Sequence, residues 1–294
     1  MQLLTTAEAA GYLRLKERKL YELVAEGAIP CTKVTGRWLF PKAELDQWLS
    51  SSLVRPDGIV LADPPPIVGG SHDPLLDWAL RESDSGLATL PEGSEGGLRR
   101  FAEGGVMAAA IHLHALESES VDANVEAILS RADLRDAVLV AFVRREQGLL
   151  VAPGNPLKLR SIEDVARLKA RMAVRPAGAG AQLLLLALLH RAGLTLEKLI
   201  VAGPPAPTGP DVAQAIRAGR ADCGIATRAV ASAANLDFVP LLWERFDLAV
   251  RSRDYFRPPL QRLMQFLRGA EFATRASELG GFDVSTAGNI RHAP

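Results

Sequence analysis

Cysteine is scarce in this sequence of 294 residues, and no cysteine and histidine spacing typical of a metal site is present. The two cysteines, Cys31 and Cys223, lie far apart along the chain. A disulfide framework or a structural zinc site needs several such residues at characteristic spacings. We therefore expect two reduced, structural thiols, as is usual in the cytosol.

The chain also lacks a long apolar run. Its most apolar stretch, Leu183–Leu189, is far too short to span a bilayer. Residues 1–25 contain many charged side chains and no apolar segment of the signal-peptide type. These absences predict a cytoplasmic protein with no membrane partner.

Neither sign of charge prevails, because 34 Lys and Arg residues balance 34 Asp and Glu residues. No global field therefore draws the chain to nucleic acid or to a membrane surface. Any DNA binding has to depend on a local basic surface.

Recognisable catalytic motifs are missing as well. The histidines occur in no local catalytic pattern, and the sequence has neither a P-loop nor a dinucleotide-binding fingerprint. We therefore expect no enzyme activity and no cofactor.

The composition that is present, 48% hydrophobic and 23% charged, is ordinary for a globular protein. The length suffices for two domains with sizeable cores. Serine, proline and glycine gather in residues 51–66, which predicts a linker. The expected organisation is a head at residues 1–50, this linker, and a larger domain at residues 67–294.

The head shows the signals of a helix-turn-helix. Thr5 and Glu8 can form a capping box, and an apolar stripe at helical spacing follows. A second helix is expected over residues 17–26, with Gly27 after its end. Two short strands at 33–34 and 38–40 predict a hairpin, and Pro41 is expected to open a third helix.

The phrase LTTAEAAGYLRLKERKLYELVAEGAIPCTKVTGRWLFPKAELDQWL resembles the winged helix-turn-helix of excisionase and MerR-type regulators. That resemblance implies that the second helix enters the major groove of double-stranded DNA and that the hairpin contacts its backbone or minor groove. The predicted DNA-binding residues are Lys16, Arg18, Lys19, Tyr21, Lys33 and Arg37. The alternative for each is an ordinary solvated residue, because the head has seven basic residues against six acidic ones.

Two apolar runs mark the middle of the larger domain. Leu139–Val143 and Leu149–Val151 are interpreted as buried strands, separated by a polar turn at Arg144–Gly148. Farther on, near the return to the first part of the domain, Glu244 and Arg245 are expected to be ion-pair partners at a hinge rather than ligand contacts.

A strand at residues 172–174 then leads through Arg175 and a glycine-containing loop into a helix that begins at Ala181. Backbone N–H groups converge at such a helix start, and the helix dipole favours an anion there. Arg175 adds a fixed positive charge. The sequence therefore predicts an anion site at this loop.

The phrases REQGLLVAPGNP, GRADCGIATRAVA and LDFVPLLWERFDLAV occur in that order. They resemble the periplasmic-binding-protein-like domain that is often fused to helix-turn-helix heads, and a similar domain is fused to molybdopterin molybdotransferases. The resemblance covers roughly residues 67–270. It implies an α/β, type II fold whose two lobes close on a small ligand, with residues 67–142 and 240–294 in lobe 1 and 148–238 in lobe 2.

The glycine loop departs from the RGSGTR-like pattern of that family. It reads RPAGAGAQ, so hydroxyls are missing at Ala179 and Ala181 and an arginine is replaced by Gln182. Recognition of an oxyanion by the backbone alone and room for a larger organic acid are both compatible with this change.

Strand-to-helix loops supply the other candidate ligand contacts, because binding-protein lobes place donors there. Asp73 in the first loop is better explained as a helix N-cap, and Ser94 is expected both to cap a helix and to face the ligand. The predicted ligand-binding residues are Ser71, His72, Ser94, His112, Arg175, Gly178, Ala179, Gly180, Ala181, Gln182 and Thr227.

A strand over residues 105–113 is expected to end at His112 and His114. Two histidines spaced i, i+2 on a strand share a face, which is compatible with a metal. The sequence offers no third ligand nearby, so no metal site is expected. The family resemblance favours His112 of the two as a ligand contact.

Together these features predict a ligand-responsive DNA-binding transcription regulator. A homodimer is expected, because one small head makes too few contacts for specific binding. The ligand is expected to be a small anion, and the resemblance to the molybdotransferase-fused domain suggests molybdate or tungstate. Two alternatives stay open: a cytosolic binding or carrier protein whose head recruits a protein partner, and an excisionase-like recombination accessory factor.

Overall fold

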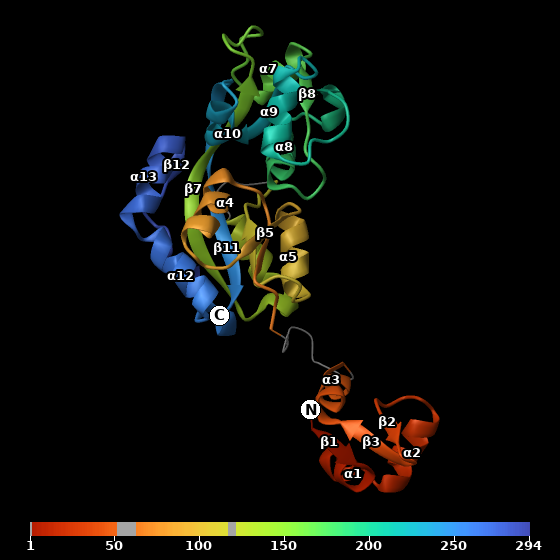
Figure 1. Cartoon of the computed structure of the whole chain (residues 1–294). Helices are drawn as coiled ribbons and strands as arrows, with labels where there is room; N and C mark the ends of the chain where they lie inside the picture. The colour runs from red at the N-terminus through yellow and green to blue at the C-terminus, as the bar shows by residue number, and fades with distance from the viewer. Residues whose placement is uncertain (1, 52–62, 117–121) are drawn as a thin grey trace. The chain divides into compact units, whose positions relative to one another are not determined.

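The computed structural model describes residues 2–51, 63–116 and 122–294. The chain divides into two units, Met1–Pro56 and Asp57–Pro294, each of which is described by itself (Figure 1). Most of the predicted linker lies outside the described residues.

The first unit is a small helix and strand domain around a three-stranded antiparallel sheet in the order β1-β3-β2. Its elements are β1 (Leu3–Thr5), α1 (Thr6–Leu13), α2 (Glu17–Ala25), β2 (Thr32–Val34), β3 (Arg37–Pro41) and α3 (Lys42–Ser51). The capping box of Thr5 and Glu8 is present at the start of α1. Leu20, Phe40 and Leu45 are fully buried and join the helices to the sheet.

The role predicted for Pro41 in the head is wrong. Pro41 ends β3 instead of starting the third helix, because Leu3 pairs with it across the sheet. The strand β1 that provides this pairing has only three residues. Such a short edge strand carries too little periodicity to be recognised in the sequence.

The second unit contains the remaining elements. In chain order they are β4 (Ile67–Gly70), α4 (Pro74–Glu82), β5 (Ala88–Pro91), α5 (Ser94–Ala102), β6 (Ala108–Ile111), α6 (Ala123–Leu129), η1 (Ala132–Leu134), β7 (Ala137–Val151), α7 (Ile162–Arg167), β8 (Arg171–Ala173), α8 (Gly180–Arg191), η2 (Leu196–Lys198), β9 (Ile200–Val201), α9 (Gly209–Arg217), β10 (Cys223–Thr227), α10 (Arg228–Ala233), β11 (Asp237–Arg251), α11 (Ser252–Tyr255), α12 (Pro258–Leu267), α13 (Ala270–Leu279), β12 (Phe282–Asp283) and β13 (Ile290–His292).

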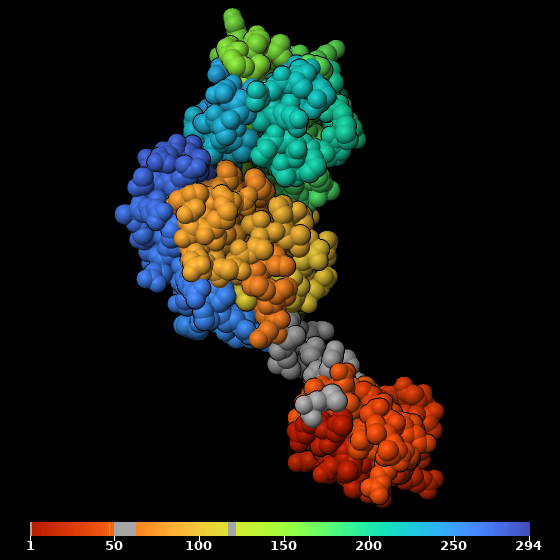
Figure 2. All heavy atoms as spheres, viewed as in Figure 1, coloured from red at the N-terminus to blue at the C-terminus, as the bar shows by residue number. Residues whose placement is uncertain are grey.

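These strands form one ten-stranded sheet that passes through two lobes. The strand order is β5-β4-β6-β11-β7-β10-β8-β9, and β12 and β13 also pair with β7. We call the part with β4, β5, β6, α4, α5, α6, α12 and α13 lobe 1, and the part with β8, β9, β10 and α7 to α10 lobe 2. In the space-filling view the orange and yellow residues of lobe 1 lie directly against the teal residues of lobe 2 (Figure 2).

The two lobes share β7 and β11, which are antiparallel strands of 15 residues each. In lobe 1, β11 also pairs with β6, whereas in lobe 2, β7 also pairs with β10. The shared pair crosses between the lobes at Arg144–Glu146 and Trp243–Arg245, which lie outside the pairings of β7 with β10 and of β11 with β6.

The predicted turn at Arg144–Gly148 is therefore wrong, because β7 runs through these residues without interruption. Successive side chains of a strand point to opposite faces. Arg145 and Gln147 are buried on one face, while Arg144 is exposed on the other. The polar residues of this stretch suggest a turn in the sequence because Glu244, the buried partner of Arg145 and Gln147, is distant in the chain.

Each lobe has helices packed on both faces of the sheet, which explains why its strands are apolar on both sides. In lobe 1, alternate residues of β7 face two cores: Phe142 packs with α4, α12 and α13, and Leu139 packs with α5 and α6. In lobe 2, Leu149 faces α7 and α8, and Leu150 faces α9. No helix of the described residues is long and apolar enough to cross a membrane.

Candidate functional site

A small cavity lies between the lobes, next to the shared strands. Its volume is about 30 Å³, and a water molecule needs roughly 10–15 Å³ of such space. The lining residues are Ser71, His72, Pro74, His112, Arg145, Gln147, Arg175, Ala179, Gly180, Ala181, Gly209, Ala226, Thr227 and Val230. The cavity therefore has room for a compact ligand and is lined by both lobes.

The wall from lobe 1 is built at the ends of β4 and β6. Ser71 follows β4, and its Oγ lies 2.8 Å from the Oγ of Ser94 at the start of α5. The backbone N–H of His112 donates to Ser94 Oγ at 3.0 Å. Ser94 thus ties the two loops together, and the N-cap of α5 is Gly93 instead. The expected capping by Ser94 is wrong, because its hydroxyl is already committed to Ser71 and His112.

Arg175 forms part of the wall from lobe 2. Its guanidinium donates to the carbonyl oxygens of Ala206 and Pro207 at 2.8 and 2.7 Å. Its backbone N–H donates to the side-chain oxygen of Gln182 at 3.0 Å. Burial lowers the pKa of Arg175 to about 10, although Asp211 opposes this shift. The side chain is still a cation at neutral pH and is held in place by the chain around it.

The loop after Arg175 makes direct contact with lobe 1. The N–H of Glu95 donates to the carbonyl of Gly178 at 3.2 Å. A Cβ on Gly180 would come within 2.3 Å of the His112 ring, so only glycine allows this approach. We call this arrangement, in which the start of α8 lies against the histidine, the closed form.

Two buried oxygens in the cavity wall have no hydrogen-bond partner within the described ranges 2–51, 63–116 and 122–294. They are Oε1 of Gln147 and Oγ1 of Thr227. Both side chains are at least nine-tenths buried. A buried polar atom without a partner costs about 1–3 kcal/mol, so the free positions indicate a site that a ligand or water completes.

A buried ion-pair network crosses the structure behind the cavity. Arg145 donates to Glu244 Oε1 at 2.7 Å and to Asp73 Oδ2 at 2.6 Å, and all three residues are buried. Gln147 donates to the same Glu244 oxygen at 2.8 Å. The Arg145 guanidinium also stacks over the ring of Phe246, 4.0 Å from its centroid. Asp73 additionally caps α4, as expected from the sequence.

The second oxygen of Glu244 faces the two histidines. His112 Nδ1 lies 3.0 Å and His114 Nε2 lies 2.8 Å from Glu244 Oε2. Burial lowers the pKa of His112 to about 4, which outweighs the opposing effect of Glu244. Burial disfavours the charge of Glu244, but the positive charge of Arg145 and the hydrogen bonds from His112 and His114 hold its pKa well below the usual range. Glu244 is therefore a carboxylate and His112 is neutral at pH 7.

Most of the predicted ligand contacts surround the one cavity. Ser71, His72, His112, Arg175, Ala179, Gly180, Ala181 and Thr227 line it. Three predicted contacts are absent from the lining and instead bind residues next to it. Ser94 accepts from the N–H of His112, Gly178 accepts from the N–H of Glu95, and Gln182 accepts from the N–H of Arg175. His72 also pairs with Asp77, its Nε2 lying 3.0 Å from the carboxylate.

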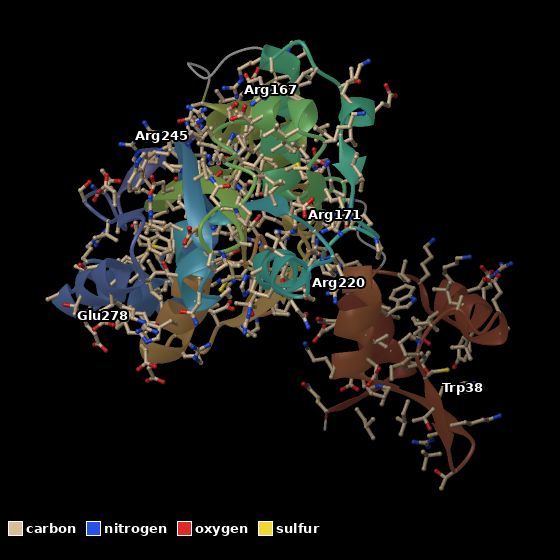
Figure 3. All side chains as sticks on the ribbon, turned by 90° about the horizontal axis from the view of Figure 1, so that it is seen from above. Trp38, Arg167, Arg171, Arg220, Arg245 and Glu278 are labelled. Carbon is tan, nitrogen blue, oxygen red and sulfur yellow. The ribbon has the colours of Figure 1, made fainter. Side chains whose placement is uncertain are left out.

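Arg145 and Gln147 are the principal residues that the sequence analysis missed. The signal that would have found them is the alternation in Arg144–Gln147, which places Arg145 and Gln147 on one face of a strand. Glu244 was correctly expected to be an ion-pair partner, since it pairs with Arg145. Arg245, the next residue of β11, is half-exposed and lies 3.8 Å from Asp122 (Figure 3).

The two histidines do not share a strand face. β6 ends at Ile111, so His112 and His114 lie in the loop that follows it. Their approach is set by Glu244, which belongs to β11 and is 130 residues from His114 in the sequence. Sequence spacing carries no information about such a contact.

In the head, all six predicted DNA-binding residues are exposed. Arg18 and Lys19 lie on α2, where both pair with Glu22 at 3.5 and 3.1 Å. Lys33 on β2 lies over the ring of Trp38 on the facing strand, 5.2 Å from its centroid. Trp38 itself packs against the head core. The exposed positions are compatible with DNA contact, and their role stays a prediction.

Comparison with known proteins agrees with this architecture. Residues 78–268 match the PBP superfamily domain, and residues 3–52 match a helix-turn-helix domain. The chain belongs to the PBP superfamily. Its fold is thus a winged helix-turn-helix followed by a two-lobed, type II binding-protein-like domain.

Similar proteins match either almost the whole chain or, among solved structures, about three quarters of it. The Bacillus subtilis protein YvgK is 24% identical over 97% of this chain and 96% of its own length. A phosphate-bound substrate-binding protein from Clostridium perfringens superposes with a TM-score of 0.54, 11% identity, and coverage of 72% of this chain and 96% of that one. A tungstate transporter structure from Geobacter sulfurreducens gives 0.51 and 14%, with coverage of 72% and 97%. At these identities the solved structures show the fold of the PBP domain and not its ligand.

Proposed function

We propose that this protein is a DNA-binding transcription regulator whose PBP domain senses a small anion. The observation that carries the proposal is the fusion of a helix-turn-helix head to a binding-protein cleft in one chain. The families found are DNA-binding and substrate-binding in nature, which supports a sensor over an enzyme.

The cavity wall supports an anion as the ligand. The first N–H groups of a helix have no partner within that helix, and Gly180 and Ala181, the first two residues of α8, line the cavity. Arg175 adds a held positive charge, and Thr227 adds a hydroxyl that can donate. These groups suit a compact oxyanion better than a cation or an apolar molecule.

The size of the cavity bears on the identity of the anion. A volume of about 30 Å³ in the closed form favours a tetrahedral oxyanion over a larger organic acid. Molybdate and tungstate are the proposed ligands because of the resemblance to the molybdotransferase-fused domain. Phosphate and sulfate have the same shape and are the competitors that the experiment has to separate.

Ligand binding can change DNA affinity only if the anion binds the closed and open forms differently. The shared strands β7 and β11 are the parts on which the lobes would rotate, since they are the covalent connections that cross between them. We propose a homodimer in which closure of each PBP domain changes the spacing of two heads on an operator.

The experiment combines calorimetry with DNA binding. Molybdate, tungstate, phosphate, sulfate and small carboxylates are titrated into the protein, and fluorescence anisotropy follows binding to a duplex obtained by selection from random DNA. We expect one oxyanion to bind and to change the affinity for the selected duplex, with binding that weakens as salt rises.

Two variants in lobe 2 separate the site from general effects. Arg175→Ala should weaken anion binding by roughly 10- to 150-fold, the range for a charged hydrogen bond. Arg171→Ala removes an exposed arginine that pairs with Asp222 and should leave the affinity unchanged (Figure 3). If no anion binds, the sensor function is wrong. If an anion binds but no duplex does, the carrier alternative is favoured.

A further inference from the structure

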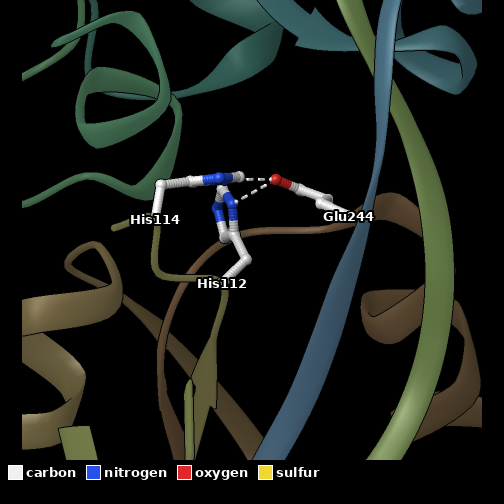
Figure 4. A group of neighbouring side chains, drawn as sticks. All are labelled: His112, His114 and Glu244. Carbon is white, nitrogen blue, oxygen red and sulfur yellow. Dashed lines mark hydrogen bonds and ion pairs between the residues drawn. The ribbon is translucent and has the colours of Figure 1, made fainter. Parts of the chain in front are cut away.

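Three candidate metal ligands from distant parts of the chain converge beside the cavity. One donor atom each of His112, His114 and Glu244 lies within 4.8 Å of the other two (Figure 4). Both histidines follow β6 in lobe 1, and Glu244 reaches them from β11. Their side chains are nine-tenths or more buried, so the positions are fixed by packing.

The two oxygens of Glu244 have different surroundings. Oε1 accepts from Arg145 and Gln147, at 2.7 and 2.8 Å. Oε2 faces the imidazole nitrogens of His112 and His114, at 3.0 and 2.8 Å. A carboxylate that binds a metal through one oxygen is expected to have these two environments. Hydrogen bonds orient the oxygen that does not bind the metal, here Oε1, and the other oxygen, here Oε2, binds the ion.

The local charge also favours a cation. Asp73 and Glu244 contribute two negative charges, and Arg145 between them contributes one positive charge, so this buried network has a net charge of −1. Uncompensated buried charge is costly. A divalent ion held between the two imidazoles and Glu244 would compensate this negative charge.

We propose that His112, His114 and Glu244 bind a divalent first-row transition metal ion, through Nδ1 of His112, Nε2 of His114 and Oε2 of Glu244. Two imidazoles and one carboxylate suit Zn²⁺ and its neighbours better than Mg²⁺ or Ca²⁺, which prefer oxygen ligands alone. With the ion bound, each imidazole would carry its proton on the nitrogen that does not face Glu244 and would bind the metal through the other nitrogen. Three protein ligands leave at least one coordination position for water or an anion.

The proposal is independent of DNA binding, and its test needs neither DNA nor an oxyanion. Protein without an affinity tag is stripped with a chelator and titrated with Zn²⁺ by calorimetry, and the complex is examined by X-ray absorption. We expect one Zn²⁺ per chain with a dissociation constant in the micromolar range or tighter. The absorption spectrum should show two imidazole nitrogens and one carboxylate oxygen at about 2.0–2.2 Å.

Variants identify the ligands. His114→Ala and Glu244→Gln should each weaken Zn²⁺ binding at least tenfold. His190→Ala removes an exposed histidine at the end of α8 and should bind Zn²⁺ like the wild type. Absence of Zn²⁺ binding, or tight binding that survives His114→Ala, would overturn the proposal. If the variants do not fold, the X-ray absorption of the wild type decides, because a coordination shell without two imidazoles contradicts the assignment.

Discussion

Arg145 Nε lies 2.7 Å from Glu244 Oε1, and this contact joins the two strands that cross between the lobes. The two residues are direct neighbours in the register of β7 and β11. Asp73, the cap of α4, is bound to the same guanidinium. One buried arginine therefore connects the crossing strands to the first loop of the ligand site.

Arg145→Ala should destabilise the PBP domain strongly. The change leaves Asp73 and Glu244 buried without their cation, and breaking a buried pair in this way costs about 3–5 kcal/mol. Urea denaturation measures the free energy of unfolding. Arg144→Ala is the matched control, because Arg144 is the preceding residue of β7. Its side chain is half-exposed and lies 3.9 Å from Asp283. The control should change stability by less than about 0.5 kcal/mol. Equal effects of the two variants would show that the network does not stabilise the fold.

Thr227→Val should separate ligand binding from stability. The Thr227 hydroxyl is buried without a partner in the described part of the chain, so its removal should leave the unliganded domain as stable or slightly more stable. Anion affinity should fall by roughly 10- to 150-fold, since a hydrogen bond to a charged group is worth about 1.5–3 kcal/mol. Thermal unfolding with and without the anion measures both quantities. Thr274→Val, on the exposed face of α13, is the control. Unchanged affinity in Thr227→Val would place the anion elsewhere.

Gly180→Ala should hold the lobes apart. The new methyl group would meet the His112 ring and backbone at about 2.3 Å, which the closed form cannot accommodate. We expect anion affinity to fall by two orders of magnitude or more, with an increased radius of gyration in small-angle scattering. Gly96→Ala adds a methyl group on α5 against only the flexible side chain of Glu92, and it should retain closure. Normal closure and affinity in Gly180→Ala would contradict the contact between α8 and His112.

Arg37→Ala tests the hairpin of the head. Arg37 starts β3 and is exposed. If it contacts a phosphate, its loss should weaken binding to all duplexes and reduce the slope of log affinity against log salt by about one. Anisotropy titrations at several salt concentrations give both values. Arg262→Ala, an exposed arginine of lobe 1, serves as the control. An unchanged slope in Arg37→Ala would remove the hairpin from the DNA contact surface.

The two cysteines should differ in reactivity. Burial raises the pKa of the Cys223 thiol to about 12, whereas Cys31 is partly exposed. The reactive form of cysteine is the thiolate, so Cys223 should resist alkylation in the native protein. Treatment with iodoacetamide at pH 8 followed by mass spectrometry should find Cys31 modified first. Cys223 should be modified only after unfolding, and rapid native labelling of Cys223 would show that lobe 2 opens locally.

The sequence by itself determined the local features. The capping box at Thr5 and the cap at Asp73 depend only on neighbours within a few residues, and both are present in the structure. Most of the residues around the cavity could also be predicted from the sequence. They belong to the glycine loop before α8 and to strand-to-helix loops, which recur at fixed places in α/β lobes.

Only the tertiary structure decided the centre of the site. Arg145 looked like part of a turn because charged residues seldom continue a buried strand, and its partner Glu244 lies 99 residues away. His112 and His114 looked like an incomplete pair of metal ligands because Glu244, which faces both, is 130 residues from His114 in the sequence. Burial of a charge is permitted only when a partner reaches it, and that partner comes from pairing β7 with β11. The pairing of β7 with β11 places Glu244 next to Arg145 and Gln147, so these polar residues form the buried network behind the ligand site instead of a turn.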